Sequence, residues 1–456
     1  MRRTMLVILF AALAPWVNAV ATPLAVQQLQ VHPRADVADL VCEKKALVTR
    51  PAAPANPDPL EIPTDELLDA MRDADPAAPT DGQQARVPSV RPGLGAGGFR
   101  MAIWGDSHLA ASFFTDELLK LLRVPGDAPS NQLLPANMGR AGVRLPLRRA
   151  CISPQWKYEP GYLGRDNTTT PGPGLMNMSS DQAGATLAWD VRKDAKSPGY
   201  ERVRILYQQT DAPMLVTIGI DGGAEQEVTL AQPAGPAVLE LVAERPIAQV
   251  KLRLVDGRFR LHGLELLAKQ ASGFQMDVFG YPGATVAGWK SARFDYFNAW
   301  FTQPAYQLVM LEFGTNEGNV KPFDVAAYRT TLVESVRNMR TAFPGAACVL
   351  IGPGDRGILV PRSSNLHQKK VKPARKIDLL VYARIHAQIG RVQAQVALDA
   401  GCSAWSMQDA MGGPGQAYRW ARQSPALMAP DLIHFTVAGY QRLAQKFARD
   451  MGWTAL

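Results

Sequence analysis

The stretch RMAIWGDSH, residues Arg100–His108, decides the fold that we predict for this chain. Its hydrophobic run, Met101–Trp104, follows the glycine-rich segment Gly93–Gly98 and stops at Gly-Asp-Ser, which is typical of a buried strand in a parallel sheet. The next residues, Leu109–Leu122, carry apolar side chains at helical spacing and no proline. Ser107 is therefore expected at a strand-to-helix junction on the carboxyl edge of the sheet, where open α/β folds bind their ligands.

After residue 270 the chain alternates between strand-like and helix-like segments. Such alternation predicts a parallel sheet with helices on both faces, and thus an α/β fold class. The strand-like run Met276–Val278 leads to a turn containing Gly283, and the run Tyr306–Glu312 leads to Asn316. Each strand end therefore delivers a residue to the same edge as Ser107.

Residues 151–270 have a different character, because short strand-like runs alternate there with turns rich in Gly, Pro, Asp and Asn. The Asp221–Gly222 pair after an apolar run is a hairpin signal. We therefore predict an all-β sandwich of jelly-roll type, inserted into the α/β domain. Trp156 and Trp189 are expected in its core rather than as sugar platforms.

Composition narrows the possible partners. The chain has 456 residues, of which 47% are hydrophobic, enough for a large core and two domains. A formal net charge of +8 is spread along the chain and suits an anionic polymer or surface. Since neither a zinc-finger spacing nor an aromatic-basic recognition motif occurs in the sequence, nucleic acid is not predicted as a partner.

The N-terminus resembles a secretory signal. Arg2 and Arg3 precede an apolar run, Met5–Ala14, and Ala19–Ala21 form a small-residue cleavage site. The apolar run is too short to span a bilayer and no later stretch is long enough, so no membrane span is predicted after signal removal. We expect an exported protein, most simply a periplasmic one. The predicted segments are a signal peptide (1–21), a proline-rich leader or linker (22–98), a first α/β part (99–150), the β insert (151–270) and a second α/β part (271–456).

Four cysteines fit an oxidising compartment, and three pairings are possible among Cys42, Cys151, Cys348 and Cys402. Cys348 and Cys402 each open a predicted strand, so these two can form a disulfide if their strands are neighbours. The wide spacing of the cysteines and the scatter of the histidines argue against a metal site.

Four loops that follow predicted strands each supply a chemically useful residue, and together they resemble a known superfamily, the SGNH (GDSL-type) hydrolases. The family motifs occur in order, as Gly-Asp-Ser at 105–107, a glycine at 283, Gly-Thr-Asn at 314–316 and Asp-x-x-His at 431–434. Glu317 stands where the family usually has Asp, a change that we expect to affect loop packing. Taken singly, each motif is also compatible with an ordinary turn or helix cap.

The resemblance implies a serine hydrolase without metal or organic cofactor. Ser107 would be the nucleophile, His434 its general base, and Asp431 the residue that orients the imidazole. The backbone N–H groups of Ser107 and Gly283 and the side-chain amide of Asn316 would form the oxyanion hole. His108, beside the serine, is expected to pack or to face the substrate rather than to act as the base.

A narrower resemblance covers residues 99–452. Gly-Asp-Ser-His, the β-rich insert, Gly-Thr-Asn-Glu and the stretch Trp405–Gly413 look like the bacterial peptidoglycan O-acetylesterases of the Ape type. This likeness implies removal of acetyl groups from O-6 of N-acetylmuramic acid in the periplasm, whereas the leader has no counterpart in it. Three alternatives stay open, namely an O-acetyltransferase, an esterase for another acetylated polysaccharide, and an inactive glycan-binding or cell-wall assembly protein. The oligomeric state is not predicted.

Overall fold

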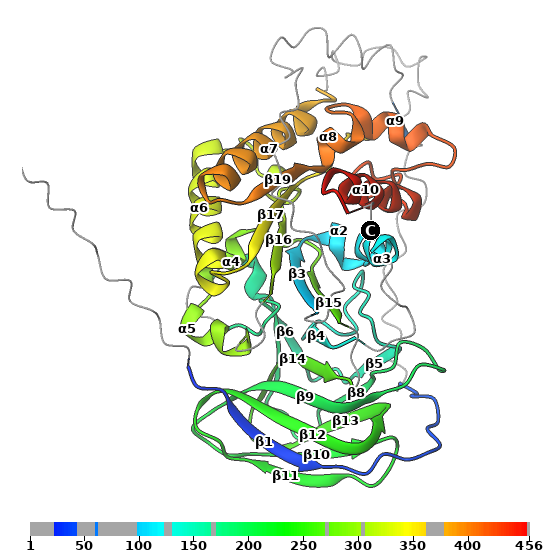
Figure 1. Ribbon diagram of the computed structural model, residues 1–456, viewed down its shortest axis with the longest axis vertical. Coiled ribbons are helices and arrows are strands. Elements are labelled where there is room, and N and C mark those ends of the chain that lie inside the picture. Colours follow the sequence, from blue (N-terminus) through cyan, green and yellow to red (C-terminus); the bar gives the residue numbers. More distant parts are fainter. Residues whose placement is uncertain are drawn as a thin grey trace, which may run out of the picture.

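The computed structural model describes residues 22–42, 60–62, 98–122, 130–165, 170–269, 273–301, 306–361 and 378–453. The predicted signal peptide, 1–21, and most of the leader lie outside these ranges. Within them, no helix has the length and apolar character needed to cross a membrane. Figure 1 shows an α/β region stacked on a region built of β-strands, with the strand-rich part at the bottom of the view.

The α/β region contains one parallel five-stranded sheet. Its order is β15 (Phe274–Gly280), β3 (Phe99–Gly105), β16 (Leu308–Glu312), β17 (Ala347–Gly352) and β19 (Ser403–Ser406). The chain enters at β3, adds β15 on one side and then continues with β16 on the other, so the strand order reverses at β3. Such a switch point opens a crevice at the carboxyl ends of the strands.

Strand β3 is buried on both faces, as its uninterrupted hydrophobic run predicts. Successive side chains of a strand point to opposite faces. Ala102 and Trp104 accordingly belong to one hydrophobic cluster, and Met101 and Ile103 belong to another. Two separate cores therefore sandwich the sheet.

Helices cover both cores. Helices α6 (Val325–Ala342) and α7 (Val381–Asp399) contribute to the Trp104 cluster, and α3 (Phe113–Leu121) and α10 (Val437–Asp450) contribute to the other. Figure 1 places α6 and α7 on the far side of the sheet from α3 and α10. The prediction of a parallel sheet with helices on both faces is confirmed.

The helix predicted over Leu109–Leu122 is wrong in one respect, because it is two helices. Helix α2 (Ser107–Ala110) ends before Ser112, whose φ of 61° breaks the helical path. The carbonyl of Ala110 accepts a hydrogen bond from the N–H of Arg144 at 2.8 Å. Apolar spacing did not reveal the break because its partner lies in another loop.

The strand-rich region consists of two sheets around one core. The seven-stranded sheet comprises β1 (Ala25–Gln30), β12 (Gly235–Ile247), β9 (Tyr200–Gln209), β14 (Phe259–Leu267), β7 (Asn177–Ser180), β6 (Lys157–Glu159) and β4 (Gln132–Pro135). The five-stranded sheet comprises β11 (Gln226–Leu230), β10 (Met214–Ile220), β13 (Gln249–Asp256), β8 (Thr186–Asp190) and β5 (Arg149–Ile152). Trp156 and Trp189 lie buried in the shared cluster, as expected. An all-β insert between β3 and β15 is thus present, and its jelly-roll topology stays a prediction.

Two predicted boundaries differ from the structure. The β insert begins before residue 151, since β4 already pairs with β14. The leader is also more than a linker, because β1 pairs in parallel with β12 along six residues. Val26 and the other side chains of β1 alternate between exposed and partly buried positions, a pattern too polar to reveal an edge strand from sequence.

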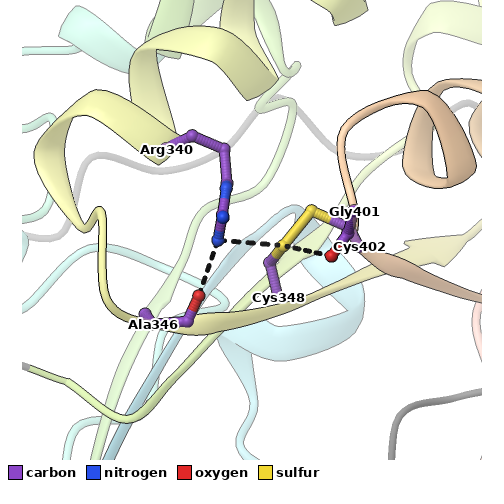
Figure 2. Close-up of a disulfide and its surroundings, with 5 residues drawn as sticks. All are labelled: Arg340, Ala346, Cys348, Gly401 and Cys402. Carbon is purple, nitrogen blue, oxygen red and sulfur yellow. Dashed lines mark hydrogen bonds between the residues drawn. A yellow bond between two sulfur atoms is a disulfide. The ribbon is translucent and has the colours of Figure 1, made fainter.

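Two disulfides fasten these parts. Cys42 of the leader is bonded to Cys151 of β5, and Cys348 of β17 is bonded to Cys402 just before β19. The second pair follows the expectation from sequence, because β17 and β19 are neighbours in the sheet. Figure 2 shows Arg340 of α6 beside this bond, where its Nη1 donates to the carbonyl of Ala346 at 2.7 Å.

Shorter elements complete the described chain. They are β2 (Leu60–Glu61), η1 (Gly161–Leu163), α4 (Ala287–Ser291), α5 (Phe294–Phe297), η2 (Asn298–Phe301), η3 (Glu317–Asn319), β18 (Val360–Pro361), α8 (Met407–Met411) and α9 (Gln416–Arg422). Among them, η1 and α4 matter for function, since they connect the sandwich with the loop after β15.

Candidate active site

Ser107 begins α2 directly after β3 and so stands at the carboxyl edge of the sheet. Asp106 caps this short helix, accepting the N–H of His108 at 2.9 Å. A Cβ on Gly105 would lie 2.5 Å from Glu312 Oε2. Glycine is therefore required at this position for the chain to make the turn that presents Ser107.

The structure brings together the three residues expected to act on each other. His434 Nε2 lies 2.9 Å from Ser107 Oγ, and His434 Nδ1 lies 2.7 Å from Asp431 Oδ2. A proton on Nδ1, held by the carboxylate, leaves Nε2 free to accept the proton of the serine hydroxyl. Burial raises the pKa of Asp431, but the hydrogen bonds and charge of His434 outweigh it, so the net pKa is lowered and the carboxylate stays ionised.

The Asp431–His434 turn is fixed by its own backbone. Asp431 Oδ1 accepts the N–H groups of Ile433 and His434, each at 2.9 Å. Leu432, which lies between Asp431 and Ile433, has a φ of 56°. This left-handed conformation is energetically unfavourable for residues other than glycine. Its fully buried side chain packs on Tyr418, and this burial holds the turn.

Two of the three predicted oxyanion donors are unengaged. Among the described residues, the N–H groups of Ser107 and Gly283 donate to no other group. Gly283 has a φ of 83° and open space where a Cβ would stand. A substrate carbonyl can therefore approach this backbone closely.

Asn316, the third predicted donor, is already hydrogen-bonded. Its Nδ2 donates to the carbonyl of Ala284 at 2.8 Å and to Asp106 Oδ2 at 3.4 Å. The amide thus ties the Gly283 loop to the Ser107 loop. An oxyanion at this position would replace the longer of the two bonds, and the oxyanion role of Asn316 stays a prediction.

A pair of buried acids lies beneath the nucleophile. Glu312 at the end of β16 accepts the N–H of Asp106 through Oε2 at 3.1 Å, while its Oε1 has no partner. Burial, and next the charge of Asp106, raise the pKa of Glu312 well above its usual value. Burial also raises the pKa of Asp106 to about 6. Burial therefore favours the neutral form of Glu312, a feature that the sequence motifs did not indicate.

Glu317 packs the loops, as its departure from the family pattern led us to expect. Its Oε1 accepts the N–H of Val286 at 2.8 Å, and its Oε2 accepts the N–H of Gly314 at 3.0 Å. The longer side chain thus joins the Gly283 loop to the Gly314 turn. Burial raises its pKa to about 7.

His108 is a packing residue. It is buried, its Nδ1 lies 3.1 Å from the hydroxyl of Tyr440, and its ring lies against Phe435. Burial, and then the charge of His434, lower its pKa to about 3. A neutral, enclosed imidazole of this kind does not compete with His434 as the base.

Two cationic side chains, Lys321 and Arg356, lie near the triad, and the sequence analysis did not identify them. Arg356 follows β17, and Lys321 follows η3. Both cations lie over the ring of Tyr382, at 4.0 and 3.8 Å from its centroid. The N–H of Gly357 donates to the carbonyl of Leu432 at 3.0 Å, which places Arg356 beside the Asp431 turn. Within the described part of the chain neither cation has an acidic partner. The position of Arg356 after a predicted strand was the available signal.

The described residues contain no preformed site for a metal ion. Across the ranges that the structure describes, no group of three or more His, Cys, Asp or Glu side chains is arranged to hold a metal ion.

Comparison with known proteins supports the fold. No family model and no curated protein sequence matches the chain. A solved peptidoglycan O-acetylesterase aligns with 81% of this chain and 97% of its own, at 23% identity and a TM-score of 0.59. At this identity the likeness establishes the shared fold and leaves the reaction open.

More distant structures also align. A carbohydrate esterase family 2 enzyme with a carbohydrate-binding domain, from Corynascus thermopiles, covers 66% of this chain and 99% of its own at 12% identity and a TM-score of 0.27. A lipase/acylhydrolase from Enterococcus faecalis covers 39% and 76% at 18% identity and a TM-score of 0.26. These two superpose too loosely to inform the site. The chain therefore shares the fold of a solved peptidoglycan O-acetylesterase, the likeness that its motifs indicated.

Proposed function

We propose that this protein is a serine esterase that removes O-acetyl groups from a cell-envelope polysaccharide, with peptidoglycan as the preferred substrate. The observation that carries the proposal is the continuous hydrogen-bond chain from Ser107 through His434 to Asp431, next to two unengaged backbone N–H groups. The fold shared with a peptidoglycan O-acetylesterase supports the choice of substrate.

The chemistry follows from the geometry. His434 Nε2 takes the proton of Ser107 as Oγ bonds to the acetyl carbon, and the carbonyl oxygen becomes an oxyanion facing the N–H groups of Ser107 and Gly283. The C–O bond to the sugar then breaks, and His434 returns the proton to the departing sugar hydroxyl. Water, deprotonated by His434, attacks acetyl-Ser107, and acetate leaves with regeneration of the serine.

Solvent access favours hydrolysis over acetyl transfer. The side chains of His434 and Asp431 are 40% and 46% exposed, so water reaches the base that must activate it. A transferase has to keep water from the acyl-enzyme, and a base this open would not do so. The complete hydrogen-bond chain likewise favours an enzyme over an inactive glycan-binding protein.

The proposed place of action is the periplasm. The N-terminal sequence has the features of a secretory signal, and both disulfides suit an oxidising compartment. Fusion of residues 1–21 to a reporter that is active only after export would test this location. A reporter retained in the cytoplasm would contradict it.

Acetate release provides the direct test of the reaction. Purified wild-type protein and Ser107→Ala should be incubated with O-acetylated peptidoglycan and, separately, with acetylated xylan. We expect release from peptidoglycan that disappears in the variant. Release from xylan alone would move the substrate to another polysaccharide.

Ser112→Ala is the matched control, since Ser112 also carries an exposed hydroxyl near α2 but only bonds the carbonyl of Arg144. It should retain activity. Equal acetate release by wild type and Ser107→Ala would refute the proposed nucleophile.

A further inference from the structure

The sandwich contains a cavity that the proposed chemistry does not use. Its volume is about 710 Å³, enough for a saccharide of a few rings. It opens where η1 meets strands β6, β7, β9 and β14 of the seven-stranded sheet. Its lining is polar and includes Arg165, Arg258, Arg260, Asn177 and Glu159.

One arginine in the cavity is held in place and two are unpaired. Arg260 forms an ion pair with Glu159 at 2.6 Å, and its Nη1 donates to Gln208 Oε1 at 2.7 Å. Arg165 and Arg258 are exposed, and no described residue pairs with them. With one acid against three guanidinium groups, the cavity carries a net positive charge that favours an anion.

A buried donor in the lining also lacks a partner. Asn177 is 1% exposed, and its Oδ1 accepts the N–H of Gly172 at 2.8 Å and lies 2.6 Å from His262 Nδ1. These contacts fix the amide, whereas its Nδ2 has no hydrogen-bond partner among the described residues. A buried N–H without an acceptor is costly unless a ligand supplies one.

The cavity wall is packed against the catalytic loops. Gly161 and Leu163 line the cavity, and Tyr162 between them stacks on Tyr281 with ring centroids 4.7 Å apart. Tyr281 precedes Gly283 by two residues. This stack joins the cavity wall to the loop that carries Gly283.

We infer that this cavity is a second glycan-binding site, which takes carboxylate groups of an acidic, acetylated polymer while another segment of that polymer is deacetylated. The inference rests on the proposed function for its substrate class. Guanidinium groups bind carboxylates through paired hydrogen bonds, and the Asn177 amide supplies a neutral donor for a sugar or carboxylate oxygen. In peptidoglycan, either the lactyl group of the sugar or the attached peptide can supply the carboxylate.

Binding can be measured without turnover. All proteins should carry Ser107→Ala, and their sedimentation with insoluble peptidoglycan should be compared for Arg165→Ala, Arg258→Ala and Arg202→Ala. Arg202 is the matched control, an exposed arginine of β9 outside the cavity. We expect each cavity variant to bind about tenfold more weakly and the control to bind as the parent does.

A second polymer distinguishes the source of the carboxylate. Glycan stripped of its peptides is soluble and carries free lactyl carboxylates, so binding to it is measured by calorimetry. A retained difference between parent and cavity variants assigns the lactyl group, and a lost difference assigns the peptide. Equal affinity of the parent, the cavity variants and the control on both polymers would overturn the inference. Absence of acetate release by the wild type would refute the proposed esterase, but it would leave this binding comparison intact.

Discussion

Replacing Glu312 tests whether the nucleophile rests on a neutral acid. Glu312 is buried, and its only hydrogen bond among the described residues is with the N–H of Asp106 at 3.1 Å. Glu312→Gln keeps an oxygen acceptor and nearly the same volume, and it carries no charge. If the native carboxyl is neutral, this change should cost less than about 1 kcal/mol of unfolding free energy, since no buried group loses its partner.

Glu312→Ala removes the acceptor as well. The Asp106 N–H that is left without an acceptor costs about 1–3 kcal/mol, and loss of one buried methylene adds about 1 kcal/mol, so the total is about 2–4 kcal/mol. The peptide that precedes Ser107 also loses its support. Displacement of the nucleophile by about 1 Å would lower kcat by about 100-fold.

Urea unfolding and turnover of a small acetate ester measure both effects. Glu312→Gln should match the wild type in stability and kcat, and Glu312→Ala should lose both. Equal losses in the two variants would refute the reasoning, because they would show that the negative charge is needed. The pH dependence gives a second check. A raised folded-state pKa means that wild-type stability falls by about 1 kcal/mol per pH unit above the ordinary carboxyl range, and Glu312→Gln should flatten this decline.

Three further predictions concern other parts of the molecule. Asp431→Asn should lower kcat by about 10⁴-fold with little change in fold, because the imidazole loses the partner that sets its tautomer. Steady-state kinetics measures kcat, and circular dichroism checks the fold. A loss of kcat below tenfold would contradict this prediction. Replacing both Cys348 and Cys402 by Ser should lower the free energy of unfolding by about 4 kcal/mol, because the disulfide closes a loop of 54 residues. Urea denaturation measures this loss. An unchanged urea midpoint would contradict the prediction. Burial raises the pKa of Asp277 and Asp355 to about 6, so the native state holds protons that the unfolded state releases above the usual pKa of 3.8. Stability should therefore fall as pH rises from about 4 to 6, and urea midpoints that rise with pH in this window would speak against it.

The sequence by itself determined the central sheet and the places of its candidate functional residues. A short hydrophobic run such as Met101–Trp104 between glycine-containing turns predicts a strand buried on both faces, and the carboxyl ends of parallel strands share one edge. Ser107 and Gly283 follow β3 and β15, so any fold with this pattern brings them together. His434 lies in a turn between α9 and α10 and not at a strand end, so tertiary packing brings it to Ser107. The pairing of Cys348 with Cys402 was one of three possibilities in the sequence, and the sheet decided it by making β17 and β19 neighbours.

Tertiary structure alone decided contacts whose partners are far apart in sequence. Strand β1 has no alternation of polar and apolar residues, and it forms a strand because it pairs with the edge of β12, more than 200 residues away. The raised pKa of Glu312 arises from burial beside Asp106, which no local pattern encodes. The packing of two loops likewise makes the side chain of Asn316 donate a hydrogen bond to the carbonyl of Ala284. Local sequence sets backbone preference and side-chain periodicity, whereas long-range packing sets burial, and burial fixes the protonation and partners of these groups.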